Sequence, residues 1–349
     1  MVSGYKTARM IFAATLAAVV PVAAQADPVE DFYKGKTLKM IIGYGVGGGY
    51  DLYGRIFAEH ISRFIPGHPN VIPQNMTGAG SFRAAQYLYS VAPQDGTAFG
   101  SVAQTLPLDT AMKGKASGMD ATKFRYIGRL VASVELGVGI PGSSIKGWEE
   151  SRTRQLIVGA TGSTSPSYLL PVALNKFGGT KFKVISGYKG STDSLLAVER
   201  KEVDIVGSMS VPTIMTKSPD WLLKKTAPVV YQAALKRHPL VQHVPALPEM
   251  GTTPDGTAAL RAIAASSEIG RSVITTPNVP AERLAALRKA FDQMVKDPVF
   301  LAEMNKRKII IEPLAGAEVD KIAAETTGTP QRILNEIALL VTPKGREKK

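Results

Sequence analysis

The sequence predicts an α/β fold with two domains, and three observations support this. Short apolar runs alternate along the chain with Gly- or Ser-rich loops and amphipathic stretches, a pattern typical of strand, loop and helix. Strands that alternate with helices in this way form mostly parallel sheets flanked by helices. The chain has 349 residues, and a chain of that length usually divides its hydrophobic core in two.

The clearest strand–loop–helix unit lies near the N-terminus. The apolar run 38–42 predicts a buried strand, and the glycine-rich segment 43–51 follows it. Helically spaced apolar residues then predict a helix: Tyr53, Ile56, Phe57, Ile61 and Phe64. A glycine loop lets the backbone approach a ligand, and a helix start presents free N–H groups and partial positive charge. This unit therefore predicts an anion site.

Similar units follow along the chain. Strands are expected at 70–72, 98–103, 154–158, 182–185 and 203–206. Helices are expected at 82–89, 168–177, 192–200 and from 281 to about 295, where Asp297-Pro298 breaks the pattern. The loops 75–81, 159–167 and 187–191, which precede three of these helices, are rich in glycine, serine or threonine.

The first residues predict export. Lys6 and Arg9 precede an apolar run at 10–24, and a small-x-small site predicts cleavage after Ala26, so residues 1–26 are expected to form a signal peptide. No later segment approaches 18 uninterrupted apolar residues. The absence of cysteine means that no disulfide staples the fold.

The charge and the sequence motifs limit the classes of ligand, partner and cofactor that this chain is expected to bind. The formal charge of +13 suits anionic ligands, but the basic residues are dispersed and the chain is exported, which argues against nucleic acid. Gly43, Gly45 and Gly48 match the dinucleotide fingerprint G-x-G-x-x-G. No acidic residue follows the strand at 70–72 to hold a ribose, and NAD is not normally available outside the cytoplasm. No cofactor is therefore expected.

The residue inventory argues against an enzyme. The sequence has no H-E-x-x-H motif, no cysteine and no G-x-S-x-G nucleophile elbow. Its histidines lack the spacing of a shared metal site: His60, His68, His238 and His243. We expect neither a metal site nor catalytic residues, with an exported hydrolase as the catalytic alternative.

Eight loops, in their order along the chain, resemble those of the Bug family, the substrate-binding receptors of tripartite tricarboxylate transporters. The segments that carry the resemblance are 32–36, 43–51, 74–81, 92–97, 187–190, 202–204, 244–247 and 276–280. Together they span essentially the whole chain after the signal peptide.

The resemblance implies a two-lobed periplasmic binding protein fold, the Venus flytrap, that closes over a small carboxylate. It implies delivery to two integral membrane permease subunits, a periplasmic location and a monomer. The chain would cross between lobes near 131–136 and 267–273. The first lobe would comprise 27–133 and 271–349, including a disordered basic tail, and the second lobe 134–270.

The resemblance also implies that two loops, one per lobe, grip the carboxylate, partly through ordered water. The expected ligand contacts are Gly45, Val46, Gly47, Gly48, Tyr50 and Asp51 in the first loop and Thr161, Gly162, Ser163, Thr164 and Ser165 in the second. Gln104 and Ser208, which follow predicted strands, are further candidates. Hydroxyls and backbone N–H groups can bind a carboxylate without a buried positive charge.

Some alternatives stay open at this stage. Asp51 either contacts the ligand or braces its own loop, since an acid facing a carboxylate repels it. Lys189 either pairs with a second carboxylate or lies exposed on a turn. Arg271 either clamps a distal carboxylate or braces the hinge. A receptor that signals to a membrane kinase would use the same mechanism, and the identity of the carboxylate does not transfer from the resemblance.

Overall fold

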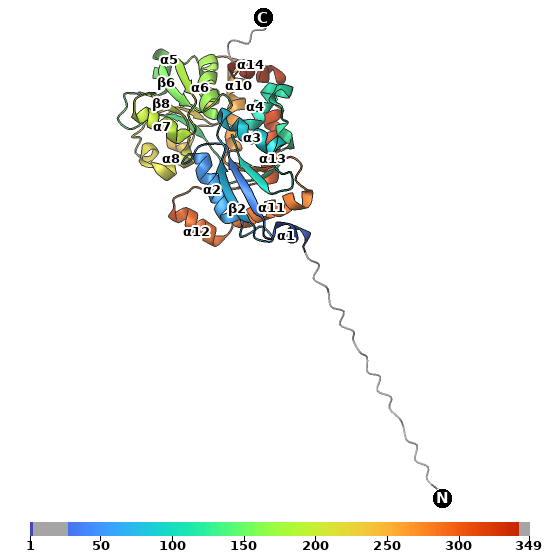
Figure 1. Ribbon diagram of the computed structural model, residues 1–349. Coiled ribbons are helices and arrows are strands. Elements are labelled where there is room, and N and C mark those ends of the chain that lie inside the picture. The colour runs from blue at the N-terminus through green and yellow to red at the C-terminus, as the bar shows by residue number, and fades with distance from the viewer. Residues whose placement is uncertain (3–26, 342–349) are drawn as a thin grey trace.

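The structure, a computed structural model, describes residues 1–2 and 27–341. The predicted signal peptide with its cleavage after Ala26 and the predicted basic tail at 344–349 lie outside the described residues. The described chain forms two lobes, each with its own sheet (Figure 1). Among the described helices, none combines the length and the apolar character that a membrane span requires.

The first lobe is built on a six-stranded sheet. Its strand order is β11 (Leu314–Ala315), β4 (Tyr126–Arg129), β10 (Ser272–Thr275), β3 (Ala98–Ser101), β1 (Thr37–Ile42) and β2 (Asn70–Asn75). The accompanying helices are α1 (Pro28–Tyr33), α2 (Gly49–Ile61), α3 (Phe82–Ser90), α4 (Leu106–Lys113), α11 (Ala281–Met294), α12 (Pro298–Lys306) and α13 (Gly316–Thr327). Short 3-10 helices are η1 (Ala79–Ser81), η2 (Gly114–Ser117) and η3 (Ala121–Lys123).

The second lobe is built on a five-stranded sheet. Its order is β7 (Phe182–Ser186), β6 (Leu156–Ala160), β8 (Ile205–Ser210), β5 (Glu135–Val138) and β9 (Val229–Ala233). Its helices are α5 (Trp148–Thr153), α6 (Pro166–Phe177), α7 (Ser191–Glu199), α8 (Val211–Lys217), α9 (Asp220–Leu223), α10 (Pro254–Ala265), η4 (Pro239–Val241), η5 (Leu247–Met250) and η6 (Ser266–Glu268). The last helix, α14 (Gln331–Val341), also packs here, against α6 and α10.

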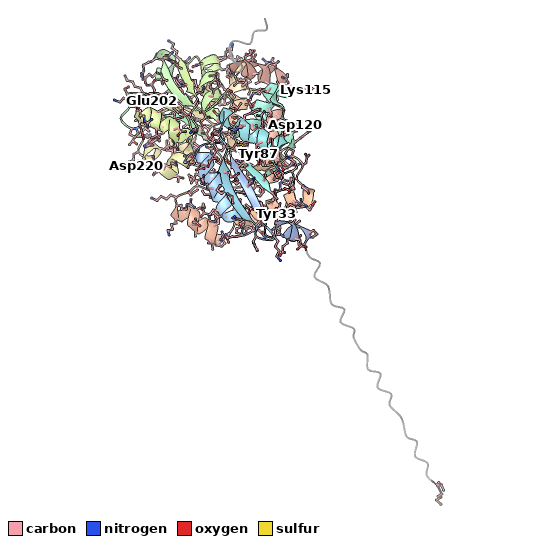
Figure 2. All side chains as sticks on the ribbon, in the orientation of Figure 1. Tyr33, Tyr87, Lys115, Asp120, Glu202 and Asp220 are labelled. Atoms are coloured by element: carbon pink, nitrogen blue, oxygen red, sulfur yellow. The ribbon has the colours of Figure 1, made fainter. Side chains whose placement is uncertain are left out.

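Burial follows the pattern expected of strands inside a layered fold. Leu38, Met40 and Ile42 of β1 pack into one core cluster, whereas Ile41 packs into the cluster on the opposite face. This alternation is the two-residue period of a strand whose two faces are both covered. Charged side chains such as Glu202 lie exposed at the rim of the molecule (Figure 2).

Both sheets are mixed. Strand β1 pairs in parallel with β2 and β3, and β6 pairs in parallel with β7 and β8. Strands β5 and β10, which follow the passages between lobes, run antiparallel to both of their neighbours. The predicted two-lobed α/β fold flanked by helices is confirmed.

Two adjacent segments form the hinge between the lobes, and a third connection, residues 328–330, leads from α13 of the first lobe to α14 on the second. Residues 130–134 lead from β4 to β5, and residues 269–271 lead from η6 to β10. The Leu130 N–H donates to the Arg271 carbonyl at 3.0 Å, and the Arg271 N–H donates to the Val131 carbonyl at 2.9 Å. Gly270 has a φ of +53°, and a Cβ there would lie 2.2 Å from the Val131 carbonyl oxygen, so this close pairing requires glycine. The lobe limits at 133 and 270 stay a prediction.

Candidate functional site: a cavity between the lobes

A cavity of about 40 Å³ lies between the two lobes and is lined from both of them. A buried water needs roughly 10–15 Å³ of such space, so the cavity has room for a few waters or one small ligand group. Most of the accessible wall is apolar, but many of its residues carry hydroxyl groups: Thr161, Ser165, Ser167, Ser191, Ser194, Ser208, Ser210 and Thr213.

Three helices begin at the wall of this cavity. The first residues of α2, α6 and α7, which are Gly49, Pro166 and Ser191, all line it. Within the described part of the chain, no side chain caps the N-terminus of any of these helices. Uncapped N–H groups and the positive end of each helix dipole favour an anion. The cavity is therefore a positively polarised space with contributions from both lobes.

A buried ion pair forms another part of the wall. Arg271 is 3% exposed and Glu135 is 2% exposed, and Arg271 Nη2 donates to Glu135 Oε1 at 2.8 Å. The Nε and Nη1 groups of Arg271 have no hydrogen-bond partner. Burial favours the neutral guanidine, but the negative charge of Glu135 keeps the pKa of Arg271 above its ordinary value. Arg271 thus adds a buried positive charge to the wall, although its two unpaired nitrogens are themselves closed off from the cavity.

Two tyrosines support this guanidinium. The Cζ of Arg271 lies 3.8 Å from the ring centroid of Tyr50, and Tyr44 stacks on Tyr50 at 4.4 Å. Burial raises the pKa of Tyr50 to about 12, so its hydroxyl stays neutral at physiological pH. A Cβ on Gly49 would lie 2.4 Å from Thr213 Oγ1 and 3.2 Å from Arg271 Nη2. Glycine at the start of α2 therefore lets the helix end approach the guanidinium.

Comparisons with known proteins fit this architecture. No model of a known protein family matches the sequence. A Cupriavidus necator protein, described as "UPF0065 protein in gbd 5'region", is 28% identical over 355 residues, covering 95% of this chain and 97% of that protein. The periplasmic binding protein BugD superposes with a TM-score of 0.66 at 18% identity, covering 88% and 97% of the two chains. This chain has the Bug fold.

A second solved structure with the Bug fold carries a ligand. MatC from Rhodopseudomonas palustris, with bound malate, superposes with a TM-score of 0.65 at 17% identity. The match covers 86% of this chain and 99% of MatC. The sequence resemblance to the Bug receptors is thereby confirmed at the level of the fold.

Within this Bug fold, the expected ligand contacts separate into two groups. Those that line the cavity are Gly48, Tyr50, Thr161, Ser165 and Ser208. Those that lie outside its wall are Gly45, Val46, Gly47, Asp51, Gln104, Gly162, Ser163 and Thr164. Apart from Gln104 and Ser208, both groups come from the two expected loops, so neighbouring residues of one loop differ in whether they reach the cavity.

Part of the first loop closes the cleft instead of lining the cavity. The Gly45 N–H donates across the lobes to the Lys189 carbonyl at 2.9 Å. The Lys217 ammonium, from the second lobe, donates to the Gly47 carbonyl. The side chains of Val46 and Lys189 are exposed, Val46 at 68%. These contacts connect the two lobes beside the cavity, at residues of the first loop that do not line it.

Asp51 braces the same loop. Its carboxylate accepts hydrogen bonds from the Gly47 N–H at 2.9 Å, from Arg55 Nε at 2.9 Å and from Asn75 Nδ2 at 2.8 Å. Burial opposes ionisation, yet these bonds together hold the pKa of Asp51 below its ordinary value. Asp51 stays ionised near neutral pH and holds the first loop in place through its hydrogen bond from the Gly47 N–H.

Replacing Asp51 by Asn should weaken this brace. The amide has the same size but no charge, so we expect a loss of about 1–3 kcal/mol in unfolding free energy at pH 7, measured by urea denaturation. A carboxylate whose pKa is lower in the folded than in the unfolded state stabilises the fold at pH values above its unfolded pKa. This stabilisation is lost as the pH falls through the folded pKa. The difference between wild type and Asp51→Asn should therefore shrink below about pH 4. Asp120→Asn, at the exposed N-cap of η3, is the control, because asparagine caps a helix about as well as aspartate; equal loss in both variants would contradict the brace.

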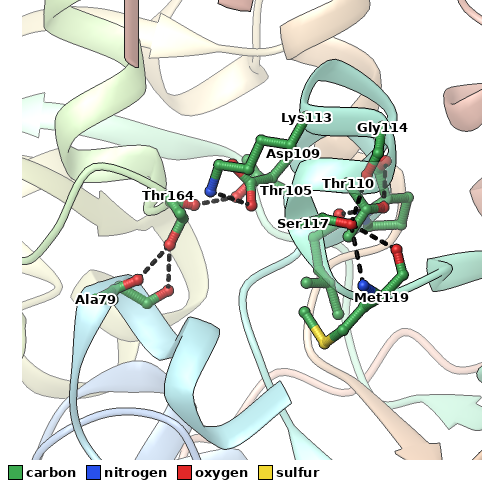
Figure 3. A network of polar contacts seen from close by, with 12 residues as sticks. Ala79, Thr105, Asp109, Thr110, Lys113, Gly114, Ser117, Met119 and Thr164 are labelled. Carbon is green, nitrogen blue, oxygen red and sulfur yellow. Dashed lines mark hydrogen bonds and ion pairs between the residues drawn. The ribbon is translucent and has the colours of Figure 1, made fainter. Parts of the chain in front are cut away.

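The second loop ties the lobes together through Thr164 (Figure 3). Its hydroxyl donates to the Ala79 carbonyl, with the Gly80 carbonyl at 3.3 Å. Its own carbonyl accepts from the Thr105 hydroxyl at 2.9 Å. Ser163, the neighbouring residue, is exposed. The part of this loop that faces the cavity is therefore Thr161 and Ser165, on either side of the contact between lobes.

Gln104 lies at the hinge. Its Nε2 donates to the Ser133 carbonyl at 3.1 Å, and its N–H donates to the Tyr50 hydroxyl at 2.9 Å. Gln104 thus holds the tyrosine that underlies Arg271, and it does not itself line the cavity.

Several wall residues were absent from the sequence-based set of site residues. Ser191 and Ser194 lie at the start of α7, behind the glycine loop 187–190, so the strand–loop–helix rule could have found them. Ser167 links the second loop internally, because its hydroxyl accepts from the Thr161 N–H at 3.0 Å. Glu135 carries no local sequence signal.

One group of potential metal ligands occurs among the described residues, away from this cavity. Glu59, His60 and Glu303 place one ligand atom each within 4.8 Å of one another. The Arg307 guanidinium lies 3.3 Å from Glu59 and 3.1 Å from Glu303. Both carboxylates are thus already paired with a cation.

Proposed function

We propose that this protein is a periplasmic receptor that captures a small carboxylate in the cavity between its lobes. The observation that carries the proposal is the cavity between the lobes, at which α2, α6 and α7 begin and whose wall includes the side chain of Arg271. The chain has the fold of periplasmic binding proteins, and MatC is a protein of this fold with bound malate.

A carboxylate is the ligand that this chemistry favours. Its oxygens accept hydrogen bonds only, and the wall offers helix N–H groups and hydroxyls as donors. Charge-assisted bonds of this kind are about twice as strong as neutral ones. Glu135 already balances the charge of Arg271, so the ligand's negative charge is offset mainly by the helix ends.

Ligand binding should favour the closed arrangement of the lobes. The wall includes Gly48 and Tyr50 from the first lobe and Thr161, Ser165 and Ser208 from the second. A ligand in contact with both lobes has its full set of bonds only when they are closed, and that differential affinity shifts the equilibrium.

We further propose delivery of the carboxylate to a membrane transporter with two integral permease subunits. This part rests on the family resemblance and on the similarity to BugD and to a protein described as a periplasmic transporter. The receptor would act as a monomer, without catalysis, cofactor or nucleic acid. Signalling to a membrane kinase is the alternative use of the same binding step.

A thermal-shift screen tests the binding proposal. Purified protein is heated with a library of small carboxylates, each paired with its primary amide and its alcohol. A carboxylate at 100 times its dissociation constant should add about 2.7 kcal/mol of stability, whereas its neutral analogues add little. Stabilisation by sugars or nucleotides alone, with no effect of any carboxylate, would contradict the proposal.

A further inference from the structure

We propose that α8 is a clamp that holds the two lobes closed without a ligand, through hydrogen bonds that Thr216 and Lys217 make to the first lobe. The helix belongs to the second lobe and lies beside the start of α2 (Figure 1). The inference concerns contacts between the lobes themselves, so it does not depend on what the cavity binds.

Helix α8 presents two different faces. Val211 and Ile214 are buried in the core of the second lobe. Thr213, Thr216 and Lys217 are spaced i, i+3 and i+4, so they share another face of the helix. The apolar side chains therefore fix α8 to its own lobe, and the polar side chains are left to contact the other lobe.

The polar face bonds to two segments of the first lobe that are distant in sequence. The Lys217 ammonium donates to the Gly47 carbonyl. The Thr216 hydroxyl donates to the Lys308 carbonyl at 3.3 Å. Burial lowers the pKa of Lys217, and the negative charge of Asp51 in the first lobe opposes that shift. A hydrogen-bonded cation of one lobe is thus attracted to an acid of the other.

These bonds need no ligand. Neither Thr216 nor Lys217 lines the cavity between the lobes. Thr213, one turn earlier, does line it, and a Cβ on Gly49 would lie 2.4 Å from its Oγ1. One helix therefore contributes to the cavity wall at its start and bonds to the first lobe at its end. Because the bonds join protein to protein, they raise the fraction of unliganded protein in the closed arrangement.

Distance measurements on the protein without any ligand test the clamp. The chain contains no cysteine, so Val299→Cys on the first lobe and Glu202→Cys on the second introduce two labelling sites, both at exposed positions. Pulsed electron spin resonance then gives the distribution of distances between two spin labels. The separation of these positions in the structure marks the closed arrangement, and we expect that arrangement to be populated in the labelled parent protein.

Two substitutions remove the clamp bonds. Lys217→Met removes the ammonium, and Thr216→Val removes the hydroxyl at almost the same side-chain shape. Each lost hydrogen bond should reduce the ratio of closed to open protein about two- to tenfold, and the double variant should reduce it further. Lys224→Met is the matched control, because this exposed lysine of the second lobe pairs with Asp220 of the same lobe.

The clamp predicts longer distances in the double variant and unchanged distances in the control. Identical distributions in the parent, the double variant and the control would overturn the inference, and so would a parent that is entirely open. Because no ligand is added, failure of the clamp leaves carboxylate capture intact. Failure of every carboxylate to bind would overturn the proposed function and leave the clamp intact.

Discussion

Replacement of Arg271 by Met should abolish carboxylate binding and strongly destabilise the fold. Among the described residues, Arg271 carries the only guanidinium of the cavity wall, and the change also leaves Glu135 as an unpaired buried charge. We expect affinity to fall at least about a hundredfold, and unfolding free energy to fall by about 3–5 kcal/mol. Calorimetry measures the affinity, and urea denaturation measures the stability.

A double variant separates these two effects. In Arg271→Met with Glu135→Gln the buried charge is gone, so most of the lost stability should return, whereas binding should stay lost. Arg237→Gln, which breaks an exposed ion pair with Glu249, is the control and should change neither quantity appreciably. Recovery of carboxylate affinity in the double variant would contradict the role of Arg271 as anchor.

The substitution Gly162→Ala should hold the cleft open. A Cβ on Gly162 would lie 2.5 Å from the Gly80 nitrogen and 2.8 Å from the Ala79 carbonyl carbon, and both atoms belong to the other lobe's backbone. Backbone atoms cannot move aside as a flexible side chain can, so the lobes must separate. We expect at least about a tenfold loss of affinity, because the closed state becomes less populated.

The stability of each lobe should be almost unaffected by this change, since the clash exists only in the closed arrangement. Scattering should give a larger radius of gyration with saturating ligand for Gly162→Ala than for wild type. Gly328→Ala, whose Cβ would meet its nearest atoms at an ordinary 3.4 Å, is the matched control. Wild-type affinity in Gly162→Ala would contradict the inferred closure.

Sequence patterns predicted many of the elements because those patterns are local. The expected strand at 38–42 corresponds to β1, and the expected helix at 192–200 corresponds to α7. The helix expected from 168 begins two residues earlier, at Pro166, because proline is compatible with the first turn of a helix. The strand expected at 154–158 is displaced to β6, where it leads directly into the loop.

The candidate site was only partly predictable, because its chemistry depends on contacts distant in sequence. Glu135 and Arg271 are 136 positions apart and meet only where the two hinge segments pair. The sequence also favoured a site without a buried positive charge, whereas Arg271 lines the cavity. Thr161 and Ser163 differ in direction although they share a loop, which only the backbone conformation decides.

The most direct test of carboxylate capture is a crystal structure of the protein with the acid that gives the largest thermal shift. We expect the carboxylate in the cavity between the lobes, in contact with the start of α2 and with the wall of the second lobe. A ligand bound elsewhere, or held by one lobe alone, would contradict it.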